Sequence, residues 1–124
     1  MDTITFLITV NIKKDADDDK MRETMAQLAA SVSQKPGARF YQSFQRQPGK
    51  LEFIETFSDS SAALHHLKNQ DDKLAATWFA MIDLEAITVV GPASDALKAE
   101  IDTYPLPSKP VYVETISGFP PSSG

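Results

Sequence analysis

The chain has 124 residues, of which 42% are hydrophobic and 23% charged, and these proportions are typical of one folded globular domain. It has no cysteine, so disulfides, thiolate nucleophiles and zinc–cysteine sites are excluded. A net charge of −5 without a basic run argues against nucleic-acid binding, which needs cations to neutralise phosphates. Apolar runs are far shorter than the roughly 20 residues of a membrane-spanning helix, and the start MDTITF lacks the basic flank of a signal peptide. We therefore expect a cytoplasmic protein that binds neither nucleic acid nor membrane.

The first third of the chain predicts a strand and a helix. Residues 3–13 (TITFLITVNIK) alternate in polarity, which predicts a strand with one apolar face and one mixed face that ends near Asn11. The acidic residues within 15–19 suit the first turn of a helix, where the helix dipole favours negative charge. Pro36 and Gly37 end this helix. Its apolar residues recur at helical spacing: Met21, Met25, Leu28 and Val32.

A hairpin and two helices are predicted next. Residues 38–45 and 51–57 each alternate as strands do, and the turn sequence QPGK between them predicts a β-hairpin. Ser58 or Asp59 caps the following helix, which carries the only two histidines of the chain. A further helix is predicted over 72–81, with an apolar stripe of Leu74, Trp78 and Ile82.

The last third holds shorter elements. They are, in order, a strand over 86–90, a helix that Ser94 opens, a loop with three prolines over 104–110 and a strand over 111–116. We expect residues 1–119 to form a single domain and residues 120–124 to form a flexible tail.

The order β-α-β-β-α-β, with a helix and a strand appended, predicts an α+β fold of the ferredoxin-like type, an antiparallel sheet with helices on one face. The other face of this sheet also carries apolar groups, which we place at Thr5, Leu7, Tyr41 and Ile54. Large apolar faces are rarely left in water, and a second copy of the same sheet would cover this one. We therefore expect a homodimer that pairs through its sheet faces.

Residues 54–67 (IETFSDSSAALHHL) resemble the antibiotic biosynthesis monooxygenase family of small dimeric α+β barrel proteins. The shared pattern is an apolar strand, a glutamate, an aromatic, a polar cap and a helix that ends in histidine-leucine. In this chain those positions are Glu55, Phe57, Ser58-Asp59 and His66-Leu67. The segments GPASDALKAEID and ISGF near the C-terminus also fit some members of the family.

The resemblance implies a function. Such proteins oxidise phenols, quinols or anthrones with dioxygen and without metal or flavin, because the deprotonated substrate itself reduces dioxygen. It therefore implies a cofactor-independent monooxygenase that binds a phenolic, quinol or polyketide-like aromatic and needs no cofactor. The five scattered glycines, which form no dinucleotide fingerprint, are compatible with that implication. The alternative is a non-catalytic small-molecule binding or stress-response protein on the same scaffold.

The chain departs from the family at positions that matter for chemistry. The resemblance places an asparagine and a tryptophan of some oxygenases at Phe53 and Phe57, and phenylalanine donates no hydrogen bond. Haem-degrading relatives use a strand asparagine, matched by Asn11, and a helix tryptophan, where this chain has His66. Thr77 or a neighbouring alanine falls where their iron ligand lies, so we reject a haem site.

The two histidines are adjacent in the chain, so their side chains cannot bind the same metal ion. Neighbouring residues on a helix diverge, so His65 and His66 do not clamp a metal as an i, i+4 pair would, and we expect no metal site. Ala63, Leu64 and Leu67 define the buried direction of the helix, which sends His65 into solvent and leaves His66 at the border of the core. Either His66 bonds to nearby backbone, or it is catalytic as a base or as a donor to a bound phenolate.

The remaining site candidates are weaker. Glu55 shares a strand face with apolar residues and needs a partner such as Arg39, Arg46 or His66, for a structural or a supporting catalytic role. Asn11 is a candidate catalytic residue or a polar strand-end residue. Trp78 is core or pocket wall. The aromatic candidates for the substrate pocket are Phe40, Tyr41, Phe53, Phe57 and Trp78.

Overall fold

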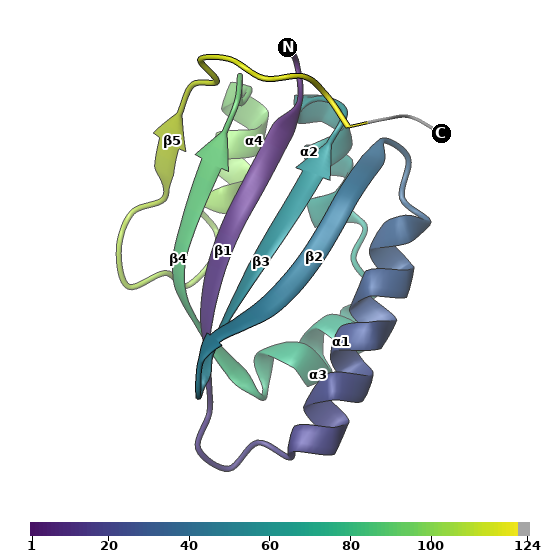
Figure 1. Ribbon diagram of the computed structural model, residues 1–124, viewed down its shortest axis with the longest axis vertical. Helices are drawn as coiled ribbons and strands as arrows, with labels where there is room; N and C mark the ends of the chain where they lie inside the picture. Colours follow the sequence, from purple (N-terminus) through teal and green to yellow (C-terminus); the bar gives the residue numbers. More distant parts are fainter. Residues whose placement is uncertain (122–124) are drawn as a thin grey trace.

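The computed structural model describes residues 1–121, which form five strands and four helices (Figure 1). The strands are β1 (Ile4–Ile12), β2 (Ala38–Gln47), β3 (Lys50–Phe57), β4 (Ile82–Val90) and β5 (Val111–Val113). The helices are α1 (Asp18–Ser33), α2 (Ser60–Lys68), α3 (Asp72–Phe79) and α4 (Asp95–Ile101). Of the predicted tail 120–124, residues 120 and 121 belong to no helix or strand, and residues 122–124 lie outside the described part.

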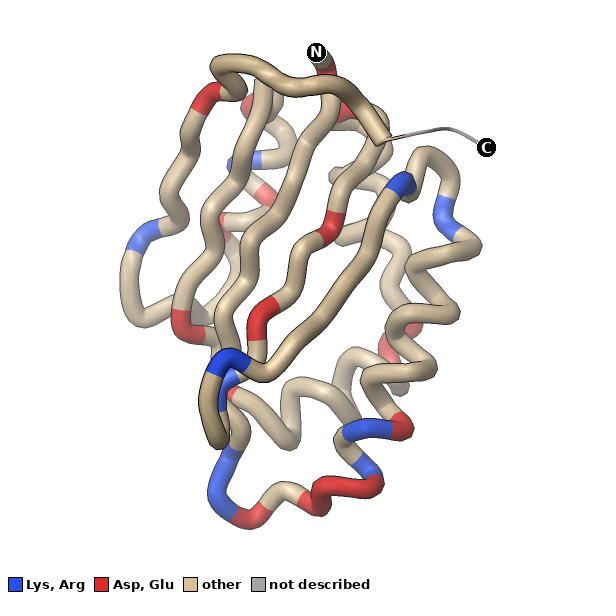
Figure 2. Tube along the Cα trace, in the orientation of Figure 1, with Lys and Arg blue, Asp and Glu red and all other residues tan. Residues whose placement is uncertain are grey.

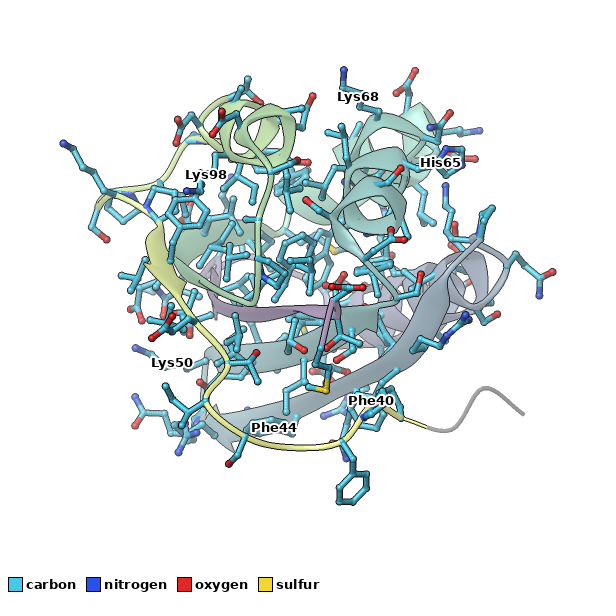
Figure 3. The ribbon with its side chains drawn as sticks, turned by 90° about the horizontal axis from the view of Figure 1, so that it is seen from above. Phe40, Phe44, Lys50, His65, Lys68 and Lys98 are labelled. Carbon is cyan, nitrogen blue, oxygen red and sulfur yellow. The ribbon has the colours of Figure 1, made fainter. Side chains whose placement is uncertain are left out.

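The five strands form one sheet in the order β2-β3-β1-β4-β5. The pairs β2–β3, β3–β1 and β1–β4 are antiparallel, as in ferredoxin-like folds, and β5 adds to the edge of β4 in parallel. Figures 1 and 3 show the helices on one face of this sheet, which leaves the other face uncovered. The predicted α+β, ferredoxin-like class is confirmed.

The alternation of apolar and polar residues in β1 explains which face of the sheet packs against the helices. Ile4, Phe6 and Val10 are buried beneath the helices, whereas Leu7 is exposed on the opposite face. Shifting the pairing by one residue would expose the whole apolar set, so burial fixes the register of this strand.

Each helix begins with a side chain that accepts a hydrogen bond from its first turn. Asp17 caps α1, Asp59 caps α2, Asp71 caps α3 and Ser94 caps α4. Each accepts from the backbone N–H three residues ahead, which satisfies a donor that the helix itself cannot pair. The predicted choice between Ser58 and Asp59 is thus resolved in favour of Asp59.

Three local predictions were wrong. β4 begins at Ile82, earlier than the predicted residue 86, because Asp83 interrupts the helix stripe and starts an alternation that belongs to a strand. β5 ends at Val113 and not at residue 116. Tyr41 faces the helices and not the open face, because the pairing of β2 with β3 shifts between Ala38 and Phe40.

The core lies between the sheet and the helices as two clusters of buried side chains. One cluster lies beneath α2 and α4 and includes Phe6, Phe57 and Leu97. The other lies beneath α1 and α3 and includes Phe53 and Trp78. Tyr41 and Ile8 pack against both clusters, and this junction is where the candidate site is found.

Across residues 1–121, none of the helices combines the length and the apolar character needed to cross a membrane.

Candidate functional site

A cavity of about 100 Å³ lies between the sheet and the helices, where the two core clusters meet. Its walls are mostly apolar and come from β1, β2, β3 and β4 on one side and from one or two residues of each of the four helices on the other. Five polar or ionisable side chains also line it: Tyr41, Glu55, His66, Gln70 and Tyr104. A small apolar space with a few polar groups is typical of a ligand site, although ligand pockets usually measure roughly 300–1,000 Å³.

Glu55 is the carboxylate of this cavity. β3 carries it on the helix-facing side between Phe53 and Phe57, opposite Phe6 on β1 and Tyr41 on β2. Only 8% of its surface is exposed. A buried carboxylate is costly unless a partner compensates its lost hydration, so its neighbours decide its chemistry.

The partner of Glu55 is His66 on α2. The imidazole Nε2 lies 3.4 Å from Oε1 of Glu55, and His66 is also only 8% exposed. The ring stacks on Phe57, with centroids 4.9 Å apart and planes inclined by 23°. Its other nitrogen, Nδ1, is buried without a hydrogen-bond partner among residues 1–121. Of the partners considered for Glu55, Arg46 instead pairs with Glu52 at the surface.

This arrangement makes Glu55 and His66 a unit that can take up one proton. The carboxylate and the imidazole are both proton acceptors, and they lie 3.4 Å apart among mostly apolar walls. A proton removed from a bound molecule would make the pair neutral overall and leave the negative charge on the oxygen of that molecule.

His65 has a different environment from its neighbour. It is exposed on the outer side of α2 (Figure 3), and its Nδ1 lies 3.3 Å from the side-chain nitrogen of Asn69. The two histidines therefore project to different surroundings, as the helical geometry predicts.

Aromatic side chains hold the wall of the cavity next to Glu55. Phe53 packs edge-to-face against Trp78, with ring centroids 5.6 Å apart, and against Tyr41, with centroids 6.1 Å apart. The structure thus brings together Tyr41, Phe53, Glu55, His66 and Trp78 around one space. Phe57 does not line that space but supports the imidazole from behind.

Two candidate residues lie elsewhere. The side-chain nitrogen of Asn11 donates to Glu85 Oε1 at 3.1 Å, and Lys50 donates to the same carboxylate at 2.9 Å. These hydrogen bonds lower the pKa of Glu85. Phe40 is 44% exposed on the open face of the sheet (Figure 3). Neither Asn11 nor Phe40 reaches the cavity, so the structure does not place them in one site with His66.

Two polar residues of the cavity were missed by sequence reasoning. Gln70 lies in the link between α2 and α3, and its Nε2 donates to the hydroxyl of Tyr104 at 3.2 Å. Tyr104 follows α4 and enters the proline-rich loop. Neither residue belongs to a periodic pattern, and only the packing of α4 beside α2 brings them together, so the sequence held no local signal for them.

The fold and its cavity define a small α+β protein with an internal cavity between sheet and helices. No family model and no curated protein matches the chain. Solved structures do. MupZ from Pseudomonas fluorescens aligns with a TM-score of 0.73 at 21% identity, over 100% of this chain and 98% of MupZ.

Two further structures carry names that describe an activity. SnoaB from Streptomyces nogalater, a cofactor-independent oxygenase, aligns with a TM-score of 0.63 at 14% identity, over 76% of this chain and 96% of SnoaB. A Chloroflexus aurantiacus protein, whose name assigns it to the antibiotic biosynthesis monooxygenases, aligns with a TM-score of 0.59 at 14% identity, over 74% and 94%. The chain therefore has the fold of the antibiotic biosynthesis monooxygenases.

Proposed function

We propose that the protein is a cofactor-independent oxygenase that oxidises a phenolic, quinol or polyketide-like aromatic with dioxygen. The observation that carries this proposal is the buried Glu55–His66 pair, with 3.4 Å between Oε1 and Nε2, in a mostly apolar cavity. The shared fold with a protein named a cofactor-independent oxygenase supports it.

The chemistry required of the chain is modest. The Glu55–His66 pair removes the proton of the substrate hydroxyl, and the resulting phenolate is electron-rich enough to pass an electron to dioxygen. One oxygen atom then replaces a ring hydrogen and becomes a quinone carbonyl. The second oxygen leaves as water, with the two hydrogens that the phenol loses. The apolar walls exclude water from the reactive anion.

A second candidate function is non-catalytic binding of a small aromatic molecule. Phe53 and Phe57 favour it, because they stand where the family resemblance places an asparagine and a tryptophan that could donate hydrogen bonds. Such a protein would bind phenols in the same cavity without consuming oxygen.

Oxygen uptake tests the proposal. The purified protein is given a panel of quinols, naphthols and anthrones in the presence of EDTA, beside the variants His66→Gln and Glu55→Gln. Removing either member of the pair is expected to lower turnover by roughly 10²- to 10⁴-fold, the usual contribution of a general base. His65→Gln is the matched control, since it changes an exposed histidine one position away, and it should keep full turnover.

The outcomes are distinct. Uptake that survives in both cavity variants would remove the pair from the mechanism. No uptake by the unaltered protein, together with saturable binding of panel members, would favour the binding function.

We also propose that the protein is a homodimer that pairs through the open face of its sheet. That face carries Leu7, Phe40 and Phe44, large apolar side chains with more than a third of their surface exposed. The segment after β5 runs along the same side in Figure 3 and adds the exposed Ile116 and Phe119. Several large apolar side chains exposed on one face often mark an interface.

A further inference from the structure

Two tyrosines, Tyr41 and Tyr104, line the cavity together with the Glu55–His66 pair. Tyr41 lies on β2 directly opposite Glu55 in the strand register, so both side chains project to the same face of the sheet. Tyr104 reaches the cavity from the loop after α4. Both lie close enough to Glu55 for its negative charge to act on their hydroxyls.

Tyr104 is held in place from several sides. Its backbone N–H donates to the carbonyl of Ile101 at 3.1 Å, and its carbonyl accepts from Leu106 at 2.9 Å. Ile101 and Leu97 anchor α4 in the core. The hydroxyl oxygen accepts the hydrogen bond from Gln70, so its lone pair is occupied while its own hydrogen can be donated to a third group in the cavity.

Both tyrosines are donors at neutral pH. Burial and then the charge of Glu100 raise the pKa of Tyr104 to about 12; the hydrogen bond from Gln70 acts in the opposite direction, and the charge of Glu55 makes the smallest contribution. Burial and the charge of Glu55 raise the pKa of Tyr41 as well. A phenol that stays protonated beside a developing anion stabilises that anion by hydrogen bonding.

We propose that Tyr41 and Tyr104 bind the substrate oxygen that becomes anionic when the Glu55–His66 pair takes its proton. This rests on the proposed function. The proton moves from the substrate hydroxyl to the Glu55–His66 pair. The oxygen left behind accepts one hydrogen bond from each tyrosine, and both tyrosines keep their own protons. The ligand class is a compound with one acidic hydroxyl on a compact apolar group.

The size of the cavity narrows this class. At about 100 Å³ the cavity is smaller than the roughly 150 Å³ engineered cavity that one benzene molecule fills, so it has no room for a polycyclic system. The reacting group is therefore a single ring, and any larger substituent extends out of the cavity.

Binding of para-nitrophenol tests the assignment without any turnover. Its phenolate absorbs visible light and its phenol does not, so a pH titration at saturating protein gives the pKa of the bound molecule. The protein is expected to lower that pKa below the value in water. Tyr41→Phe and Tyr104→Phe should each raise the bound pKa by roughly one unit, which is the effect of losing one hydrogen bond to a charged oxygen.

Tyr112→Phe is the matched control. Its hydroxyl is buried without a partner among residues 1–121, and it does not line the cavity, so the bound pKa should not move. Circular dichroism and the midpoint of urea unfolding check that each variant is folded, and a Tyr104→Phe variant that fails to fold is replaced by Gln70→Leu, which removes the hydrogen bond that orients Tyr104.

The results separate this proposal from the proposed function. A bound pKa that both tyrosine variants leave unchanged, or the absence of saturable binding of para-nitrophenol, overturns the assignment even if oxygen uptake depends on His66. If the pKa of bound para-nitrophenol is shifted in a way that depends on the tyrosines, but no substrate gives oxygen uptake, the assignment of Tyr41 and Tyr104 as donors is supported and the proposed oxygenase function is wrong.

Discussion

Gly91 and Gly49 show how one residue type serves two purposes. Both have a positive backbone φ, +118° at Gly91 and +81° at Gly49, which residues with a side chain rarely adopt. A Cβ at Gly91 would lie 2.2 Å from the carbonyl oxygen of Thr3, whereas a Cβ at Gly49 would meet nothing within 4 Å. Gly91 thus permits close packing between the end of β4 and the start of β1, and Gly49 only turns the hairpin.

This difference predicts unequal costs for the same substitution. Gly49→Ala should lower the free energy of unfolding by about 1 kcal/mol through backbone strain alone. Gly91→Ala should cost roughly 3 kcal/mol, because the backbone contact with Thr3 adds to the strain. Urea unfolding of both variants measures the two values, and equal losses would contradict the packing role of Gly91.

At the scale of elements, α2 positions the imidazole of the candidate site. Asp59 caps this helix by accepting from the N–H of Ala62 at 2.8 Å. Asp17 caps α1 in the same way, from Lys20 at 3.1 Å. The two caps are chemically alike, but only α2 carries a member of the Glu55–His66 pair.

The caps allow stability to be separated from function. Asp59→Ala and Asp17→Ala should each lower the free energy of unfolding by about 1 kcal/mol, the usual cost of a lost N-cap. Only Asp59→Ala is expected to change the pKa of bound para-nitrophenol as well, because fraying of α2 moves His66 relative to Glu55. A change of the same size in Asp17→Ala would mean that the cavity responds to general loss of stability.

Helices and strands with a regular spacing of apolar residues were predictable from the sequence. A change in which face of a strand points to the core was not. The alternation of β1 and the stripe of α1 come from local burial, so their existence followed from the sequence. The phase of β2 depends on irregular pairing with β3, which turned Tyr41 towards the helices. No local pattern reports such an irregularity.

Part of the candidate site was also predictable from the sequence. The sequence offered His66 as one of three partners for Glu55 but placed it at the border of the core, whereas the structure buries it beside Glu55. Asn11 was chosen for its polarity, which placed it on the mixed face of β1, whereas the cavity lies on the apolar face. Tyr104 depends on a non-periodic loop that only tertiary packing positions.

At the scale of the whole molecule, charge is distributed unevenly over the sheet. Figure 2 shows no Lys, Arg, Asp or Glu along β1, and many charged residues around the loop that leads into α1. Along β1 the open face therefore lacks the charges that normally keep an exposed sheet surface from associating, whereas β3 beside it carries Lys50 and Glu52 on that face. The cavity lies on the opposite side of the same sheet, among the helices.

The dimer proposal predicts a specific response to charge. Sedimentation velocity at micromolar concentration should give a mass near twice the chain mass of 13.6 kDa. Phe40→Glu places a carboxylate on the open face, where Phe40 is 44% exposed and burial of the new charge in an interface would be costly. We expect this variant to be monomeric, whereas Gln27→Glu, an equal change on the exposed side of α1, should remain dimeric.

If the unaltered protein is monomeric, the dimer proposal is wrong. If the Phe40→Glu variant is still dimeric, the interface lies on another surface.

The monomeric variant also tests whether one chain holds a complete site. Because all residues of the cavity come from one chain and face away from the open side, the pKa of bound para-nitrophenol should be the same in Phe40→Glu as in the dimer. A changed value would show that pairing of the sheets also shapes the cavity through β3, the strand that carries Glu55 and lies beside β2.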